Sequence, residues 1–546
     1  MSTEAVAIDI KKVLAHAQDR MAELDFAGAI TKIEHALRST LPSEEPTLAV
    51  RKMRLLYGES CLVTGRWDRA QREFERLLQV AGADESSLTD ASERDVFLRA
   101  QVGMAEIHSK RGEPDKSKEA LQQSRQLADK ASDLKWSLRL QIYLAEQAGQ
   151  TGELDSARSM LESIEKQLPA YPPTDDDVDP DEIAPWRDLW ADLETQWGLY
   201  FFRLARPKQA EERFEKALSF HQEADHHRLE MASVYRYLGV QASLSRHFRK
   251  ALQLHLEGLS LYIKAGCRYG MAKVYDSIGR TFLSANRLEE ATYTFRKSEQ
   301  LCRRLGANPE LATLYGKLGQ VSMMKEDFEG AIRYFRKDLE ISSQFRNYYA
   351  LGYSYRNLGR CLLQVGKFSE AVTNLKESLG LFQYVEDGMN LGRVYMDVGF
   401  AHAKAGELDE AVEASEKARS LFKEHSLVKE NAFLQCLEGI IARGHKKDAE
   451  AEKFFEDCIR SLTGGGSGVW IAETYYELGL LYRAQNKLEQ AVDSFKAAVR
   501  TARSSGLARQ VNRYLSELEN CDEIQLFEIW LEELPVPRES AEAAAD

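Results

Sequence analysis

The sequence lacks the features of membrane, secreted and nucleic-acid-binding proteins. No stretch of its 546 residues approaches about eighteen uncharged apolar residues, and the start MSTEAVAIDIKK has no basic segment followed by an apolar run. The 86 acidic residues outnumber the 73 basic ones, for a net charge of −13, which argues against a general nucleic-acid or anionic-membrane surface. We therefore expect a cytoplasmic protein without membrane insertion and without nucleic acid as a partner.

Cysteine and proline are also scarce. The 7 cysteines are odd in number, widely scattered and never in a CxxC pair, so we expect reduced, packed thiols and neither a disulfide framework nor a zinc site. Only 12 prolines are present, and no alternating Val/Ile/Thr runs bounded by turn residues appear. These absences favour an all-α fold.

Catalytic and cofactor motifs are missing as well. The run Gly464-Gly465-Gly466-Ser467-Gly468 is followed by no Lys-Ser/Thr pair, so it is interpreted as a loop and not as a phosphate site. His221, His226 and His227 fall on diverging helical faces, which favours a solvated helix end over a metal site. No GxSxG, HExxH or kinase motif set occurs. We predict that the protein is not an enzyme and holds no cofactor and no metal.

What the sequence does contain is a repeat of 40 residues. Seven glycines keep this spacing without drift, and an alanine follows each by twelve residues. Each unit has the pattern helix, short turn, helix, and a small residue in each helix lets the two axes approach closely. The marker glycines are Gly239, Gly279, Gly319, Gly359, Gly399, Gly439 and Gly479, and the alanines are Ala251, Ala291, Ala331, Ala371, Ala411, Ala451 and Ala491.

Looser copies of the same offset extend toward the N-terminus, for example Gly198 with Ala210 and Gly58 with Ala70. The count is about twelve helix pairs, and residues 507–519 fit a closing helix over the last exposed face. One unit cannot bury its own apolar face, so neighbouring units must stack.

These residues carry a family resemblance. An aromatic residue, Leu, Gly, then Ala and Phe or Leu, as in Tyr355, Leu358, Gly359, Ala371 and Leu375, resembles the tetratricopeptide repeat over nearly the whole chain. The 40-residue length resembles the long-repeat branch of Pins-type scaffolds, rapsyn-like proteins, kinesin light chains, axonemal repeat proteins and bacterial peptide-sensing regulators. The resemblance implies a right-handed superhelix whose first helices line a concave groove.

The chain is expected to divide at its interruptions. We predict looser repeats over 1–170, an acidic loop rich in Pro and Asp over 171–185, and the regular array over 186–505. A closing helix with an acidic amphipathic segment would cover 506–534, and a disordered tail 535–546.

The resemblance also places residues in the groove, at fixed offsets from each marker glycine. In the five units marked by Gly239 to Gly399, these positions hold seven basic residues against one acid, Asp276. Basic, amide and aromatic side chains suit a peptide that carries carboxylates. The predicted peptide-binding residues are Arg236, Lys273, Arg280, Gln320, Tyr353, Arg356, Arg360, Arg393 and Lys404.

The predicted function is a non-catalytic scaffold or adaptor that holds an acidic peptide or helix of a partner protein. Two other functions stay open: a peptide-sensing regulator, and a structural subunit of a larger assembly such as an axoneme. The arginines also have an alternative role, pairing with acids on neighbouring helices. The acidic tail from Asp522 to Glu533 either docks intramolecularly in the groove or simply caps the last repeat.

Overall fold

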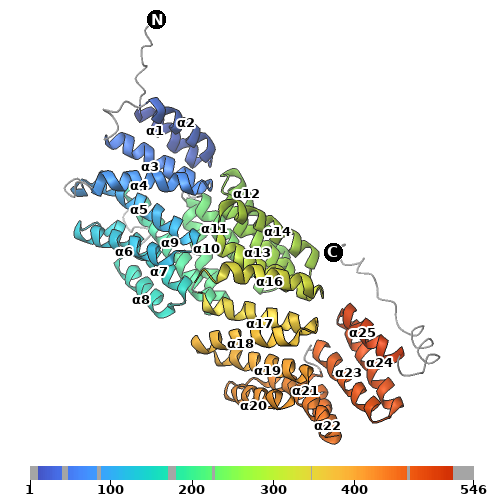
Figure 1. The fold of residues 1–546 in the computed structure, drawn as a ribbon. Helices are drawn as coiled ribbons and strands as arrows, with labels where there is room; N and C mark the ends of the chain where they lie inside the picture. The colour runs from blue at the N-terminus through green and yellow to red at the C-terminus, as the bar shows by residue number, and fades with distance from the viewer. Residues whose placement is uncertain are drawn as a thin grey trace. The chain divides into compact units, whose positions relative to one another are not determined.

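The computed structural model describes residues 10–39, 47–82, 88–169, 180–223, 228–345, 347–463 and 468–519 (Figure 1). Over these ranges the chain forms twenty-five α-helices and no strand, which confirms the predicted all-α fold. No helix in the described part of the chain is both long enough and apolar enough to cross a bilayer.

The helices α1 to α24 form twelve successive pairs, and α25 follows as the predicted closing helix. The first seven pairs are α1 (Ile10–Ala22), α2 (Phe26–Ser39), α3 (Leu48–Val63), α4 (Trp67–Gly82), α5 (Ala91–Arg111), α6 (Pro114–Lys130), α7 (Leu134–Thr151), α8 (Leu154–Gln167), α9 (Pro180–Arg203), α10 (Pro207–Glu223), α11 (Arg228–Leu244), α12 (Phe248–Lys264), α13 (Arg268–Ser284) and α14 (Leu288–Leu305). The remaining helices are α15 (Asn308–Met324), α16 (Phe328–Ser342), α17 (Tyr348–Gln364), α18 (Phe368–Tyr384), α19 (Gly388–Ala405), α20 (Leu408–Glu424), α21 (Val428–Gly444), α22 (Asp448–Leu462), α23 (Gly468–Ala484), α24 (Leu488–Ser504) and α25 (Ala508–Glu519).

The chain separates into two compact units, Met1–Leu314 and Tyr315–Asp546. This boundary lies inside the stretch 186–505 that the sequence suggested as one continuous array. The expected break at 171–185 instead falls within unit 1, where α7 and α8 pack directly on α9.

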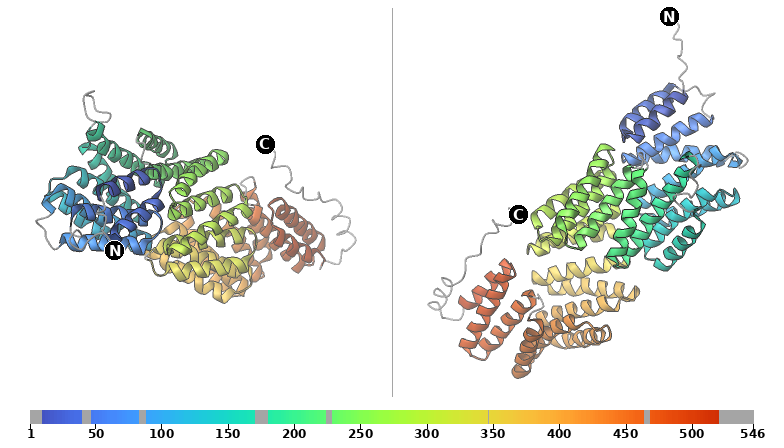
Figure 2. Two further views of the ribbon diagram at one scale, coloured as in Figure 1. Left: turned by 90° about the horizontal axis from the view of Figure 1, so that it is seen from above. Right: turned by 180° about the vertical axis from the view of Figure 1, so that it is seen from behind.

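Unit 1 extends past that break because its N-terminal pairs contact its last pairs. Leu24 and Phe26, at the α1–α2 turn, pack in one cluster with Ala265 of the α12–α13 turn. Trp67 at the start of α4 meets the edge of the Tyr269 ring on α13, with ring centroids 5.8 Å apart. Figure 2 shows α1–α4 (blue) beside the green helices of the same unit. These contacts join the early and late repeats of unit 1.

Helix α9 begins at Pro180, so the last six residues of the predicted loop 171–185 are helical. Proline is favoured in the first turn because its fixed φ suits a helix and its missing N–H has no partner there. Residues 170–179, Gly464–Ser467 and the segment 520–546, with the predicted acidic and disordered tail, lie outside the described residues.

The marker glycines hold the two helices of each pair together by close contact. A Cβ atom added at Gly279 would lie 2.5 Å from the ring of Phe295, and one at Gly439 would lie 2.4 Å from the ring of Phe455. The ring therefore occupies the space that a side chain would fill, sixteen residues after the glycine. The small residues alone do not fill the space between the helices: the alanines are fully buried, and the side chain four residues after the alanine fills the gap.

One repeat departs from this arrangement. Ser415 stands where the ring would follow Gly399, and Leu437 of the next pair fills the space, 2.6 Å from the added Cβ. The Ser415 hydroxyl instead donates to Glu438, with the two oxygens 3.3 Å apart. A side chain of the following helix pair thus fills the space that a ring at position 415 would occupy.

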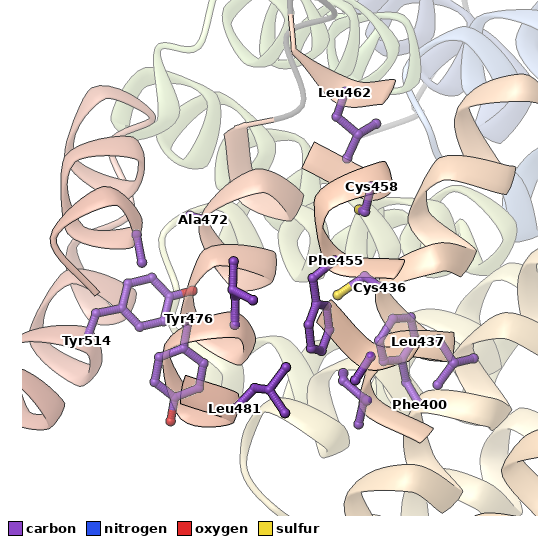
Figure 3. Close-up of a cluster of buried hydrophobic side chains, with 14 of the residues drawn as sticks. Phe400, Cys436, Leu437, Phe455, Cys458, Leu462, Ala472, Tyr476, Leu481 and Tyr514 are labelled. Carbon is purple, nitrogen blue, oxygen red and sulfur yellow. The ribbon is translucent and has the colours of Figure 1, made fainter. Parts of the chain in front are cut away.

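The largest apolar cluster lies in unit 2 and links α19 through α25 (Figure 3). Phe455 and Leu481 lie between neighbouring helices there, and the rings of Tyr476 and Tyr514 stack with centroids 4.8 Å apart. Tyr514 is fully buried, so α25 covers the apolar face of α23 and α24.

Unit 2 also contains a contact between its first and last elements. The backbone N–H of Arg509, at the start of α25, donates to the Glu326 carboxylate in the α15–α16 turn. The Arg509 guanidinium lies over the Phe328 ring, 5.2 Å from its centroid, and 3.8 Å from Glu329. The closing helix therefore contacts the start of α16.

We predict that Gly439→Ala lowers the free energy of unfolding by about 1–3 kcal/mol, because the new methyl group overlaps the Phe455 ring. Gly380→Ala is the matched control in the same unit, since nothing lies within 4 Å of its added Cβ. That control should raise stability by about 0.5–1 kcal/mol. Urea unfolding followed by circular dichroism compares the two, and equal effects would contradict the close-contact explanation.

His255 stands at a ring position, against Gly239, and its burial predicts a pH dependence. Burial, with Arg236 and Arg280 nearby, lowers the pKa of His255 from 6.5 to about 3. Between these values the unfolded chain binds a proton that the folded chain does not, so stability falls as the pH drops below 6.5.

We expect His255→Phe to remove the loss of stability below pH 6.5. Its stability advantage over the wild type should grow by about 2 kcal/mol between pH 7 and pH 5, at about 1.4 kcal/mol per pH unit below 6.5. Unfolding curves for both proteins at several pH values provide the measurement. Parallel pH profiles would show that the imidazole titrates equally in both states.

Candidate peptide-binding face

The nine predicted residues all lie on the first helices of their pairs. Arg236 lies on α11, Lys273 and Arg280 on α13, and these three belong to unit 1. The other six lie in unit 2, on α15, α17 and α19: Gln320, Tyr353, Arg356, Arg360, Arg393 and Lys404. First helices of neighbouring pairs contact one another, as α11 does α13 and α17 does α19.

In unit 1 the predicted cations interact mainly with aromatic rings or with their own helix. The Arg236 guanidinium lies 4.0 Å from the centroid of the Tyr237 ring. Lys273 Nζ lies 4.9 Å from the centroid of Tyr269, and Lys110 Nζ lies 5.0 Å from the same centroid. Arg280 Nε lies 3.4 Å from Asp276, one turn earlier on α13.

In unit 2 two of the predicted arginines are paired with acids of the next repeat. Arg356 Nε donates to Asp397 at 2.6 Å, and the two side chains are only 13% and 6% exposed. Arg393 Nη2 donates to Glu430 at 2.6 Å. These pairs join α17 to α19 and α19 to α21.

Lys404 belongs to a larger charge network. Its ammonium lies 3.2 Å from Glu473 and 3.1 Å from Glu477, both on α23. Arg443 donates to Glu477 at 2.5 Å and Arg513 to Glu473 at 3.1 Å. Burial raises the pKa of Glu473, but Lys404 and Arg513 outweigh it and hold the pKa well below its usual range. Three cations and two carboxylates thus connect α19, α21, α23 and α25.

Arg360 differs from these residues because no carboxylate among the described residues forms an ion pair with it. Gln320 is exposed, and Met324 on the same helix is 44% exposed. Met323 of α15 and Leu363 of α17 both pack against the same apolar cluster. We call the surface formed by Gln320, Met323, Met324, Arg360, Leu363 and Gln364 the α15–α17 face.

Tyr353 contributes to a different contact. Its hydroxyl accepts a hydrogen bond from the Asn390 amide at 2.8 Å and lies 3.3 Å from the Tyr349 hydroxyl. The structure therefore places Tyr353 with an aromatic cluster near the start of α17, away from Arg360 and Gln364 at the other end of that helix.

The sequence analysis did not identify the acidic residues that pair with the predicted cations. Asp397 and Glu477 each stand two residues before a marker glycine, an offset left out of the predicted set. A signal was present, because Arg356 and Asp397 are separated by 41 residues and Arg393 and Glu430 by 37, close to the 40-residue repeat. Scanning opposite charges at about one repeat length would have found both pairs.

The cysteines are free, and five of the six in the described ranges are buried. Burial raises the pKa of Cys61 to about 11 and that of Cys361 to about 12. His221 is buried on α10, not solvated as predicted, and His226 and His227 lie outside the described residues. Within the described ranges, no group of three His, Cys, Asp or Glu side chains is arranged to hold a metal ion.

Comparison with known families agrees with the repeat geometry. The family described as tetratricopeptide repeat matches residues 310–383, which span α15 to α18, and residues 472–505 of α23 and α24. The chain therefore contains tetratricopeptide repeats in these two stretches. No curated protein matches its sequence.

Solved structures with similar helix arrangements support the same fold. The apo form of RapI is similar with a TM-score of 0.54 at 12% identity, over 68% of this chain and 98% of RapI. The apo form of the quorum sensor NprR from B. thuringiensis gives a TM-score of 0.51 at 14% identity, over 68% of this chain and 99% of NprR. At these identities the likeness concerns the tetratricopeptide fold alone.

We predict that the paired and unpaired arginines of this tetratricopeptide array respond differently to substitution. Arg356→Ala leaves the buried Asp397 carboxylate without its cation and should lower the free energy of unfolding by about 3 kcal/mol. Arg360→Ala should change it by less than about 0.5 kcal/mol.

Urea unfolding checks both variants. Adding Asp397→Asn to the Arg356→Ala variant should recover part of the lost stability, because it removes the uncompensated charge. Equal destabilisation by the two single substitutions would show that Arg360 is also part of a stabilising pair.

Proposed function

We propose that this tetratricopeptide repeat protein is a non-catalytic adaptor that binds an acidic, amphipathic peptide or helix of a partner protein on the α15–α17 face. The family match over residues 310–383 and the all-α repeat fold support a protein-interaction role. The chemistry of the ligand rests on the residues of the face itself.

The single observation that carries the proposal is that Arg360 forms no ion pair with a carboxylate of the described residues. Arg356, Arg393 and Lys404 already have carboxylate partners, so a ligand carboxylate would have to displace an acid of the chain to reach them. Arg360 has no such partner among the described residues. A guanidinium can bind a carboxylate through two parallel hydrogen bonds, so an acidic group of a partner suits this position.

The neighbouring side chains define the rest of the ligand. Met324 and Met323 offer flexible apolar contacts that adapt to different side chains. Gln320 and Gln364 are exposed and supply amide donors and acceptors. One apolar stripe flanked by acids, as on an amphipathic helix, would match this arrangement.

The test is affinity measurement with peptides selected for binding to the full chain from a displayed library of amphipathic helices. The proposal expects acidic peptides to be enriched and their affinity to fall as salt is raised. Arg360→Glu should weaken them by about ten-fold to a hundred-fold, as expected for loss of a charged hydrogen bond worth about 1.5–3 kcal/mol.

Arg333→Glu is the matched control, because Arg333 is an exposed arginine on the second helix α16 of the same unit. This variant makes the same charge change and should leave peptide affinity within about two-fold. If Arg360→Glu and Arg333→Glu weaken binding equally, or if the enriched peptides carry no acids, the proposed site is wrong.

A further inference from the structure

A cluster of four tyrosines lies where α17 begins and α18 ends. Tyr348 and Tyr384 meet edge to face with ring centroids 4.9 Å apart. Tyr349 and Tyr353 both pack edge-on against Phe382, with centroids 5.9 Å and 5.3 Å away. We call Tyr348, Tyr349, Tyr353 and Tyr384 the tyrosine cluster.

Buried side chains beneath the surface support part of the tyrosine cluster. Phe382 is fully buried, and Gly352 lies so close that an added Cβ would be 3.0 Å from its ring. Asn390 donates to the Tyr353 hydroxyl at 2.8 Å and to Asp387 at 2.7 Å. These contacts restrict Tyr349 and Tyr353, so these two rings lose little additional freedom when a ligand binds.

The outer surface of the cluster is exposed. Tyr384 is 71% exposed and Tyr349 48%, and Met389 in the first turn of α19 is 45% exposed. Neighbouring exposed aromatic side chains of this kind are typical of binding surfaces, where tyrosine gives large contact area at low entropic cost. Glu386, two residues after Tyr384, is also exposed and adds a negative charge.

Exposed aromatic rings beside an acid suit a particular ligand. Proline-containing peptides bind aromatic surfaces because their extended polyproline II conformation is already favoured before binding. A basic residue next to the prolines would complement Glu386. This chemistry differs from that of the α15–α17 face, where the charge is positive.

The chain itself contains such a sequence. Residues 534–538 read Leu-Pro-Val-Pro-Arg. Two prolines at alternate positions favour polyproline II in a peptide, and Arg538 follows them directly. The charge of Arg538 is opposite to that of Glu386.

We propose that residues 534–538 of this chain dock on the tyrosine cluster, with the prolines against the tyrosine rings and Arg538 beside Glu386. This docking site is independent of the α15–α17 face, because the two share no residue.

The length of the tail is compatible with this contact. Arg509 of α25 contacts Phe328 at the start of α16, and Tyr348 follows the far end of α16. Helices of 15 and 12 residues, as α16 and α25 are, measure roughly 40 Å laid end to end. The residues 520–533 reach up to about 47 Å when extended.

A labelled peptide of residues 533–541 tests the proposal on the full chain. The variant Pro535→Ala/Pro537→Ala should bind this peptide about ten-fold more tightly than the wild type, because the wild-type tail competes at an effective concentration near millimolar. In the double-alanine variant, Tyr384→Ala should weaken the peptide at least ten-fold. Because Tyr384 is 71% exposed, this substitution should leave the unfolding midpoint unchanged.

A charge reversal makes the test specific. Glu386→Lys in the double-alanine variant should weaken the wild-type peptide, and a peptide with Arg538→Glu should regain affinity for that variant. The proposal is overturned if the peptide does not bind, if the wild type and the double-alanine variant bind it equally, or if Tyr384→Ala and Glu386→Lys leave its affinity unchanged.

Discussion

The regular array depends on one close contact that recurs in six of its seven glycine-marked helix pairs. A ring or a leucine on the second helix fills the space beside a glycine of the first, as Phe455 does at Gly439 and Leu375 at Gly359. This contact sets the distance between the helices and buries the alanine that follows the glycine by twelve residues. Because it recurs every 40 residues, side chains at matching offsets on successive first helices lie side by side.

The same regular spacing determines which charges are available to a ligand. It places Arg356 beside Asp397 and Arg393 beside Glu430, and it brings Lys404 to the carboxylates of α23. The Arg356–Asp397 pair is buried, and removing either partner would leave an uncompensated charge. Arg356, Arg393 and Lys404 therefore have carboxylate partners within the chain, whereas Arg360 has none among the described residues.

Periodic features of the sequence predicted the fold well, and features that depend on tertiary contact were missed. The spacing of Gly239 to Gly479 predicted the helix pairs and the closing helix, because each repeat makes the same local contacts. Unit 1 contains contacts between residues far apart in the sequence, such as Trp67 and Tyr269, about two hundred residues apart, and a local repeat pattern does not show such contacts. The predicted binding residues stay a prediction, and a count of basic residues did not show that Arg356 and Arg393 have acidic partners in the next repeat.

Hydrogen exchange on the full chain, with and without a bound acidic peptide from the selection, tests the central claim most directly. If the unpaired part of the first-helix surface is the binding site, exchange should slow in residues 315–324 and 353–364, with α19 to α23 unchanged. Protection centred on α19 to α23 would contradict the account, because it would show that the ligand displaces the internal ion pairs.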